Sequence, residues 1–409
     1  MNSTCADYAN APRRVPPKRR MLVVTPRFPY PVVGGDRLRI INVCRELARD
    51  NELTLASLCA TREELGAVVP TDIFTTVHRV FYPAWRSMLN VLSAMPTREP
   101  LQVAYFRSRE LHRLVDRLSP SHDVLLAHLA RTADYVCGRG LDAIVEMTDA
   151  VSMNYSRVRE RGAHVGPLRA WLYGRECDRI MAYEQELARR AELCVFVSEV
   201  DRDFLYGDRP EHLLNTMVCS NGVDCDAFPF AFEHGANRVC FIGNMTTLQN
   251  LDAAHYFAEE VLPRVRTRVP EATFEVVGRI DDKGRRVLAD IPGVRVTGFV
   301  PDVAAAVRGA TVGVCPMRLG AGVQNKVLEY MSLGIPAIVS SLAYEGLTAR
   351  SGAEVIVADD ADAVAEHVGR ILRNRAEALG MAEAARRYVE RKHSWSALLA
   401  PLRKHIASL

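Results

Sequence analysis

The chain has 409 residues, which is too many for one ordinary hydrophobic core and indicates two domains of roughly 150–200 residues each. Its hydrophobic content of 48% and charged content of 25% are those of a globular protein, and no stretch reaches the ~18–20 consecutive apolar residues of a membrane span. The net charge of only +3 argues against a dedicated nucleic-acid binder, which usually carries a strongly basic stripe.

Residues 1–20 are polar and basic, and no apolar segment of the kind that follows the charged start of a signal peptide is present. We therefore expect a disordered basic leader. Its positive charges are of the type that contacts anionic lipid, although a short charge run is more often simply solvated. They are Arg13, Arg14, Lys18, Arg19 and Arg20.

The first half of the chain alternates short apolar runs with helical patterns. Residues 21–25 form a continuous apolar run, as buried parallel strands do, and a turn containing Gly34 and Gly35 follows. Residues 36–49 then carry apolar side chains at helical spacing. Further strands are predicted over residues 53–58, 77–81, 123–127, 143–147 and 193–197, and a long helix over residues 168–191.

The same pattern begins again in the second half. Strands are predicted over residues 239–242, 273–277, 294–298, 311–315 and 337–340, with a helix over residues 251–269 and a last helix over roughly 376–409. Residues 222–237 lack periodicity and are interpreted as a linker. Alternating strands and helices predict an α/β fold of two Rossmann-like, doubly wound parallel sheets that face a cleft.

The predicted domains follow from these patterns. We expect the leader over residues 1–20, a first Rossmann-like domain over residues 21–225, and a second one over residues 236–380. A C-terminal helix over residues 381–409 would pack back toward the first domain. In sheets of this kind ligands bind beyond the carboxyl ends of the strands, so the cleft between the two domains is the predicted site.

The most informative segment, residues 318–339, runs from a strand end through a glycine loop into a helix and then into another strand. Gly320 and Gly322 allow backbone amides to approach a ligand closely. The helix that begins just after them offers unsatisfied N–H groups and the positive end of a dipole, which suits a phosphate.

Charged side chains in this segment fit the same ligand. Arg318 and Lys326 are predicted to add cationic contacts to a diphosphate, and Glu329 lies on the same helical face as Lys326, where its carboxylate would accept both hydroxyls of a ribose. The alternative is a glycine loop needed only for packing, with Lys326 and Glu329 forming a surface ion pair.

These residues resemble a family. The run G-x-G-x-x-x-K-x-L-E-x-M-x-x-G-x-P over residues 320–336 is similar to the donor-binding signature of glycosyltransferases with the GT-B fold, family 4, with its "group 1" C-terminal domain. The resemblance continues through residues 29–36, 220–224, 241–250, 296–302 and 393–395, in the family's order. Within the family, the sugar transferases of exopolysaccharide clusters associated with PEP-CTERM and exosortase genes are the most similar subgroup.

The resemblance implies roles for individual residues. Glu329 would hold the ribose and Lys326 the diphosphate, and both would act in catalysis. The remaining contacts to the donor would come from both domains. They are implied for Gly34, Gly35, Gly243, Asn244, Gly278, Arg279, Val300, Gly322, Val323 and Gln324. The chain departs from the family at Ala321, where a glutamate eight positions before Glu329 usually contacts the donor hexose.

Three polar positions follow predicted strands of the first domain and therefore point to the cleft. His128 follows residues 124–127 and is a candidate catalytic residue, with a structural histidine as the alternative. Asp149 follows residues 144–147, where it would bind acceptor hydroxyls or cap the next helix. Ser198, with Glu199 after it, occupies the same kind of position.

Neither a metal site nor a disulfide framework is predicted. The sequence has no Asp-x-Asp at a strand end and no close histidine pair. No two of its ten cysteines have C-x-x-C spacing, and those within apolar runs are expected to fill the core of a protein in a reducing cytosol. We expect no cofactor.

The resemblance implies a retaining, metal-independent glycosyltransferase of bacterial cell-surface polysaccharide biosynthesis, acting on a glycan or lipid-linked acceptor. It would be cytoplasmic and peripheral to the inner membrane, although no amphipathic anchor helix stands out in the sequence. A nucleotide-sugar 2-epimerase or a non-catalytic nucleotide-sugar binder has the same architecture. A dinucleotide oxidoreductase is disfavoured because no G-x-G-x-x-G follows the first strand.

Overall fold

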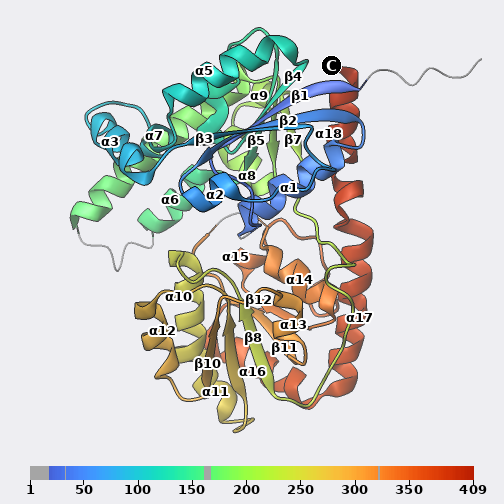
Figure 1. The fold of residues 1–409 in the computed structure, drawn as a ribbon. Coiled ribbons are helices and arrows are strands. Elements are labelled where there is room, and N and C mark those ends of the chain that lie inside the picture. The colour runs from blue at the N-terminus through green and yellow to red at the C-terminus, as the bar shows by residue number, and fades with distance from the viewer. Residues whose placement is uncertain (1–17, 33, 161–166, 321–322) are drawn as a thin grey trace, which may run out of the picture.

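A computed structural model describes residues 18–32, 34–160, 167–320 and 323–409 of the chain. They form two α/β domains, one above the other in Figure 1, with the last helix beside the first domain. The predicted leader lies outside the described residues except for Lys18, Arg19 and Arg20, of which the last two begin the first strand.

The first domain contains a sheet of seven strands in the order β3-β2-β1-β4-β5-β6-β7, and every neighbouring pair is parallel. The strands are β1 Arg19–Thr25, β2 Asn51–Cys59, β3 Thr76–Phe81, β4 Val124–His128, β5 Asp142–Thr148, β6 Leu193–Phe196 and β7 Thr216–Val218. β1 is wholly apolar at its centre because it is buried on both faces between β2 and β4.

The second domain repeats this order in a six-stranded parallel sheet, β10-β9-β8-β11-β12-β13. Its strands are β8 Arg238–Ile242, β9 Thr273–Val277, β10 Val294–Gly298, β11 Val312–Cys315, β12 Ala337–Val339 and β13 Ile356–Val357. In each sheet the early strands are added on one side of the first strand and the later strands on its other side. The strand order therefore switches between β1 and β4 in the first sheet and between β8 and β11 in the second. Ligands of such sheets bind at this point.

Helices cover both faces of each sheet (Figure 1). In the first domain they are α1 Gly35–Leu47, α2 Arg62–Gly66, α3 Ala84–Ala94, α4 Leu101–Tyr105, α5 Arg109–Leu118, η1 Ser119–Ser121, η2 Ala130–Tyr135, α6 Val151–Glu160, α7 Pro167–Arg190, α8 Glu199–Tyr206 and α9 Pro210–Leu213. In the second they are α10 Leu248–Tyr256, η3 Phe257–Val261, α11 Leu262–Arg266, α12 Asp282–Ala289, α13 Val303–Val307, α14 Asn325–Leu333, α15 Ser341–Tyr344, α16 Ala361–Arg373 and α17 Arg375–Lys392. α18 Trp395–Ser408 ends the chain.

The chain crosses between the domains twice. The first crossing follows β7, and the second lies at His393, between α17 and α18. The single helix predicted over residues 376–409 is therefore two helices, because Ser394 caps a new helix by accepting a hydrogen bond from the backbone N–H of Ala397. α17 contributes Ala378 and Tyr388 to the core of the second domain, and the predicted boundary at residue 380 falls inside it.

α18 belongs to the first domain by its contacts. Trp395, Leu399 and Leu402 lie in one apolar cluster with Ile40 of α1 and Val23 of β1. α18 thus packs against the first half of the chain. The described cysteines are all free, and those predicted to fill the core, such as Cys44 and Cys240, are fully buried.

Candidate active site

Three glycine turns lie side by side at the carboxyl ends of β8, β9 and β10. The backbone N–H of Gly243 donates to Val277 O at 3.0 Å, and that of Gly278 donates to Gly298 O at 3.1 Å. Gly278 has a φ of 134°, and a Cβ added there would lie 1.9 Å from Gly243 O. Only glycine fits this position, which explains on steric grounds why glycine occupies the predicted turn at the end of β9.

The side chains on these turns make different contacts. The Asn244 Oδ1 atom accepts hydrogen bonds from the backbone and side chain of Thr246, so it closes its own turn. Arg279 is exposed, with its guanidinium 5.8 Å from the centre of the Phe299 ring, and Val300 is half-buried against the core. Phe299 is 59% exposed, which leaves an aromatic face and a cation available to a planar base.

α14 begins directly after the predicted glycine loop. Gly320 has a φ of 132°, and Gln324 is the N-cap of the helix. The first turn of such a helix has backbone N–H groups without intrahelical partners, which favour an anion. Gly322 and Ala321 lie outside the described residues. Val323 is buried, and its carbonyl oxygen accepts a hydrogen bond from the Asn221 Nδ2 atom at 3.2 Å.

Lys326 is held at the start of α14 by neutral partners. Its Nζ atom donates to Asn250 Oδ1 at 2.9 Å and to Gln324 Oε1 at 3.3 Å, and it lies 5.1 Å from the centre of the Phe241 ring. Asn250 in turn donates to Asn244 O at 3.1 Å. Within the described residues no carboxylate lies within ion-pair distance of Lys326, so this buried ammonium keeps an uncompensated charge at the predicted phosphate position.

Glu329, one turn further along α14, is half-buried. Burial raises the pKa of its carboxyl to about 7, and the nearby Lys326 opposes part of this rise. The surface ion pair considered for these two residues is absent from the described part of the chain. The carboxylate is therefore desolvated in advance, which strengthens any hydrogen bonds that a ligand hydroxyl would donate to it.

Arg318 departs from its predicted role. Its guanidinium donates two hydrogen bonds to Asp252, from Nε at 3.0 Å and from Nη2 at 2.6 Å, and stacks on Tyr256. This two-bond pairing engages the side chain with the second domain itself. The positive charge that remains uncompensated beside the glycine loop is that of Lys326.

The glycine loop of the first domain meets α14 across the domain boundary. Gly34 has a φ of 98° and precedes α1, and a Cβ added to Gly35 would lie 3.4 Å from Asn325 Nδ2. The Oδ1 atom of Asn325 is buried without a hydrogen-bond partner among the described residues. The backbone of the first glycine loop thus lies directly against the residue that begins α14.

Other contacts join the carboxyl edges of the two sheets. Arg157 of α6 forms an ion pair with Glu345 at 2.7 Å and donates to Gly320 O in the second glycine loop. Ser198 lies against Gly346, because a Cβ added to that glycine would be 3.0 Å from the serine Cβ. Ser198 also caps α8 by accepting from Asp201 N at 3.1 Å, which is its structural role.

His128 is buried at the end of β4. Its Nδ1 atom lies 2.5 Å from Glu146 Oε2, and the other oxygen of Glu146 lies 2.5 Å from Arg39 Nε. Sequence reasoning missed Arg39 and Glu146. The signal that could have found them is a charge in an apolar setting, since Glu146 interrupts the buried strand β5 and Arg39 lies among apolar residues of α1.

Asp149 follows β5 as predicted, in the loop before α6. Its Oδ2 atom accepts a hydrogen bond from Asn154 Nδ2 at 3.2 Å. Burial raises the pKa of the Asp149 carboxyl, and Arg131 opposes the rise. The backbone N–H groups at the start of α6 donate instead to the Glu184 carboxylate, so Asp149 is not the carboxylate that caps this helix.

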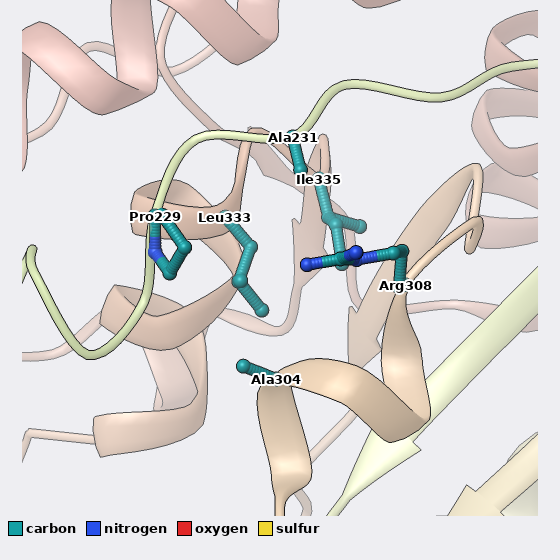
Figure 2. A pocket seen from close by; sticks show the side chains of 6 residues that line it. All are labelled: Pro229, Ala231, Ala304, Arg308, Leu333 and Ile335. Carbon is teal, nitrogen blue, oxygen red and sulfur yellow. The ribbon is translucent and has the colours of Figure 1, made fainter.

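A small pocket elsewhere is not part of this site. It is lined by Pro229, Ala231, Ala304, Arg308, Leu333 and Ile335 (Figure 2). These residues precede β8, β11 and β12, so the pocket lies at the amino edge of the second sheet, opposite to the edge that binds ligands. In the part of the chain that the structure describes, no three potential metal ligands cluster, and no helix has the length and apolar composition needed to span a membrane.

Residues 236–374 match the sequence model of the family "Glycosyl transferases group 1". No curated protein sequence matches the chain significantly. Solved structures do match over nearly the whole chain. HepE from Anabaena, in complex with UDP and glucose, is 12% identical with a TM-score of 0.66, and the match covers 96% of this chain and 100% of that one.

Two further structures have the same arrangement. Sucrose-phosphate synthase from Thermosynechococcus elongatus is 13% identical with a TM-score of 0.70, covering 96% of this chain and 100% of that one. WaaG, a glycosyltransferase involved in lipopolysaccharide biosynthesis, is 14% identical with a TM-score of 0.64, covering 94% and 99%. At these identities the matches establish the fold alone, which is GT-B. The glycosyl transferase model that matches residues 236–374 does not favour the epimerase and binder alternatives. By the group 1 glycosyl transferase domain in its second half, the chain is a glycosyltransferase of the GT-B type.

Proposed function

We propose that the chain transfers a sugar from a nucleotide donor to a glycan or lipid-linked acceptor, with retention of configuration and without a protein-bound metal. The observation that carries the proposal is that one helix presents both the uncompensated Lys326 ammonium and the desolvated Glu329 carboxyl. The first suits a diphosphate and the second a ribose, and both follow a glycine loop at the ligand edge of the sheet.

The donor would lie along the strand ends of the second domain. Its base would stack near Phe299 and Arg279, with Val300 beside it, and its diphosphate would lie at the first turn of α14. The turns at Gly243 and Gly278 leave room for its backbone contacts. Gly34 and Gly35 would approach the sugar from the first domain with their backbone atoms, because the loop that they form lies against Asn325 at the start of α14.

The chemistry follows from this placement. The bond between the sugar's anomeric carbon and the diphosphate oxygen breaks, and the acceptor oxygen bonds to that carbon on the same face. The proton of the acceptor hydroxyl passes to an oxygen of the departing diphosphate. Lys326 and the α14 amides stabilise the negative charge that develops on the diphosphate, which is where most of the rate enhancement would arise.

UDP-hexoses are the first donors to test, because HepE is solved with UDP-glucose. The purified protein would be titrated with UDP-, GDP-, dTDP- and ADP-sugars, and donor hydrolysis would be followed with and without EDTA. We expect one base to raise the melting temperature, hydrolysis to survive EDTA, and Lys326→Ala to abolish both effects. Activity that disappears with EDTA would refute the metal-independent part, and no response to any nucleotide sugar would refute the donor site.

A lipid-linked acceptor of bacterial surface polysaccharide synthesis, reached at the cytoplasmic face of the inner membrane, is supported by α3. Its apolar residues Trp85, Met88, Leu89 and Leu92 share one helical face and are each more than half exposed, at 61%, 53%, 56% and 60%. This differs from the sequence prediction, which identified no amphipathic anchor. Residues 84–118 carry six arginines against three acidic residues, which favours an anionic lipid surface.

The membrane part has its own test. Trp85→Ser combined with Leu89→Ser should abolish sedimentation of the protein with phosphatidylglycerol vesicles, while leaving hydrolysis of the soluble donor unchanged. Leu214→Ser is the matched control, because Leu214 is 85% exposed in the turn between α9 and β7. Equal binding of the double variant and the control to vesicles would show that α3 is not the contact.

A further inference from the structure

Three ionisable side chains from separate elements form a buried line in the first domain. Arg39 of α1, Glu146 of β5 and His128 of β4 are 1%, 0% and 3% exposed. Burial alone would raise the pKa of the Glu146 carboxyl, but Arg39 and His128 hold it down at about 2. Glu146 is therefore a carboxylate at every working pH, and the hydroxyl of Thr148 also donates to it at 3.2 Å.

An ionised carboxylate determines which nitrogen of His128 carries the proton. Glu146 only accepts hydrogen bonds, so Nδ1 of the neutral imidazole must be the donor and Nε2 keeps a free lone pair. Nε2 is buried and has no hydrogen-bond partner among the described residues. Leaving such an atom unpaired is unfavourable, and a ligand hydroxyl that donates to Nε2 would remove this cost.

Backbone strain is concentrated at the same place. Leu129 and Thr148 have φ values of 70° and 66°, and they are two of the three described non-glycine residues with positive φ. Leu129 directly follows His128, and its N–H donates to Glu146 O at 2.7 Å. Strained residues of this kind are typical of functional sites, where surrounding contacts hold a required geometry.

Arg39 extends the line to the domain boundary. Its Nη2 atom donates to Cys219 O at 2.9 Å and its Nη1 atom to Asn221 Oδ1 at 2.9 Å, both at the first crossing. The Nδ2 atom of Asn221 then donates to Val323 O, immediately before the N-cap of α14. A continuous set of hydrogen bonds therefore joins His128 in the first domain to the donor loop in the second.

We propose that Glu146 and Arg39 are positioning residues of the transfer reaction. They hold the proton of the neutral His128 ring on Nδ1, which leaves Nε2 free to accept a hydrogen bond from a ligand hydroxyl, and through Asn221 they connect that histidine to the donor loop. The inference rests on the proposed function, and what it adds is the role of Glu146 and Arg39 in fixing the orientation and tautomer of His128.

A double-mutant cycle tests the proposal through donor hydrolysis. Glu146→Gln should lower kcat about 10- to 100-fold, by analogy with the carboxylates that orient metal-ligating histidines, and should leave the affinity for UDP alone unchanged. In a His128→Ala background the same change should have no further effect on kcat, because Glu146 acts through His128. Losses that multiply, or weaker UDP binding in Glu146→Gln, would indicate a merely structural role and overturn the proposal.

Folding is controlled within the same experiment. Glu146→Gln leaves the buried charge of Arg39 without its partner, so Arg39→Met with Glu146→Gln is measured beside it. We expect this pair to recover stability and to keep the low kcat. Recovery of kcat together with stability would overturn the assignment.

A measurement without turnover separates this inference from the proposed function. In protein labelled with ¹⁵N-histidine, His128 at alkaline pH should show a protonated Nδ1 and a bare Nε2, and Glu146→Gln should abolish this preference. If the wild type hydrolyses no nucleotide sugar, the proposed function fails while this spectrum still tests the positioning. A neutral His128 protonated at Nε2 would overturn the inference.

Discussion

The second domain presents glycine turns and one uncompensated lysine at the carboxyl edge of its sheet, whereas the first domain places a buried network around the Glu146 carboxylate at its strand ends. Both sheets have the same strand order, so topology explains where the two edges lie but not this difference. Lys326 is bonded only to neutral groups, whereas Glu146 is bonded to Arg39, His128 and Thr148. The edge of the second sheet is therefore suited to bind a negatively charged ligand, whereas the network in the first domain fixes the orientation of a side chain.

The comparison also concerns distance along the chain. The donor segment of the second domain is contiguous, with Gly320, Lys326 and Glu329 within ten residues of one another. In the first domain, Arg39 lies 107 positions from Glu146 and 182 from Asn221. Replacing members of each set tests whether the two edges differ as described.

The largest expected effect is on stability in the first domain. Arg39→Met should lower the free energy of unfolding by about 3–5 kcal/mol, because it leaves the Glu146 carboxylate buried without its main partner. Chemical denaturation followed by circular dichroism measures this loss. Arg45→Met on the exposed face of α1 is the control and should change the value by no more than about 0.5 kcal/mol. A loss as small for Arg39 as for Arg45 would remove the contrast between the two edges.

The next effect is on turnover in the second domain. Lys326→Ala should lower kcat for donor hydrolysis by about 10²–10³-fold, because the charge that develops on the diphosphate loses its main cation. Its stability should change less than that of Arg39→Met. Lys283→Ala, on the exposed surface of α12, serves as the control for loss of a lysine charge. Turnover that is equal in the two variants would contradict the assignment of the diphosphate position.

A pH effect of intermediate size should follow from Glu329. Its carboxyl, with a pKa of about 7, is increasingly neutral below that pH and then accepts fewer hydrogen bonds from a ribose. Affinity for UDP should therefore weaken as the pH falls below 7, by at most about tenfold per unit, since one proton competes with the ligand. Isothermal titration calorimetry from about pH 5.5 to about pH 8.5 measures this dependence. Glu329→Gln should bind weakly and independently of pH, and an unchanged slope would exclude Glu329 as its source.

The smallest expected effect is at the boundary between the domains. Arg157→Ala removes an ion pair with Glu345 that is partly exposed, so stability should fall by only about 0.2–1 kcal/mol. Arg189→Ala, which removes a pair within one domain, is the control. Both are measured by denaturation. A loss in Arg157→Ala as large as that in Arg39→Met would show that the boundary, rather than the interior of the first domain, holds the critical charges.

Local patterns in the sequence were sufficient for the framework. Apolar runs followed by glycine predicted the strands and turns of both sheets, because a buried parallel strand and its tight turn each impose a residue type at a known place. The short edge strands β7 and β13 were not predicted, since three and two residues carry too little pattern. The break in the terminal helix was missed because Ser394 is a cap only if the chain turns there.

The sequence by itself determined the two-domain α/β architecture and the donor segment from Gly320 to Glu329, because those features depend on residues that are neighbours in the chain. Only the tertiary structure decided that Arg318 pairs with Asp252, that α3 exposes its apolar face, and that Glu146 holds His128. The physical reason is the same in each case. A charge or an apolar side chain has no fixed role until folding determines which distant group, or solvent, it contacts.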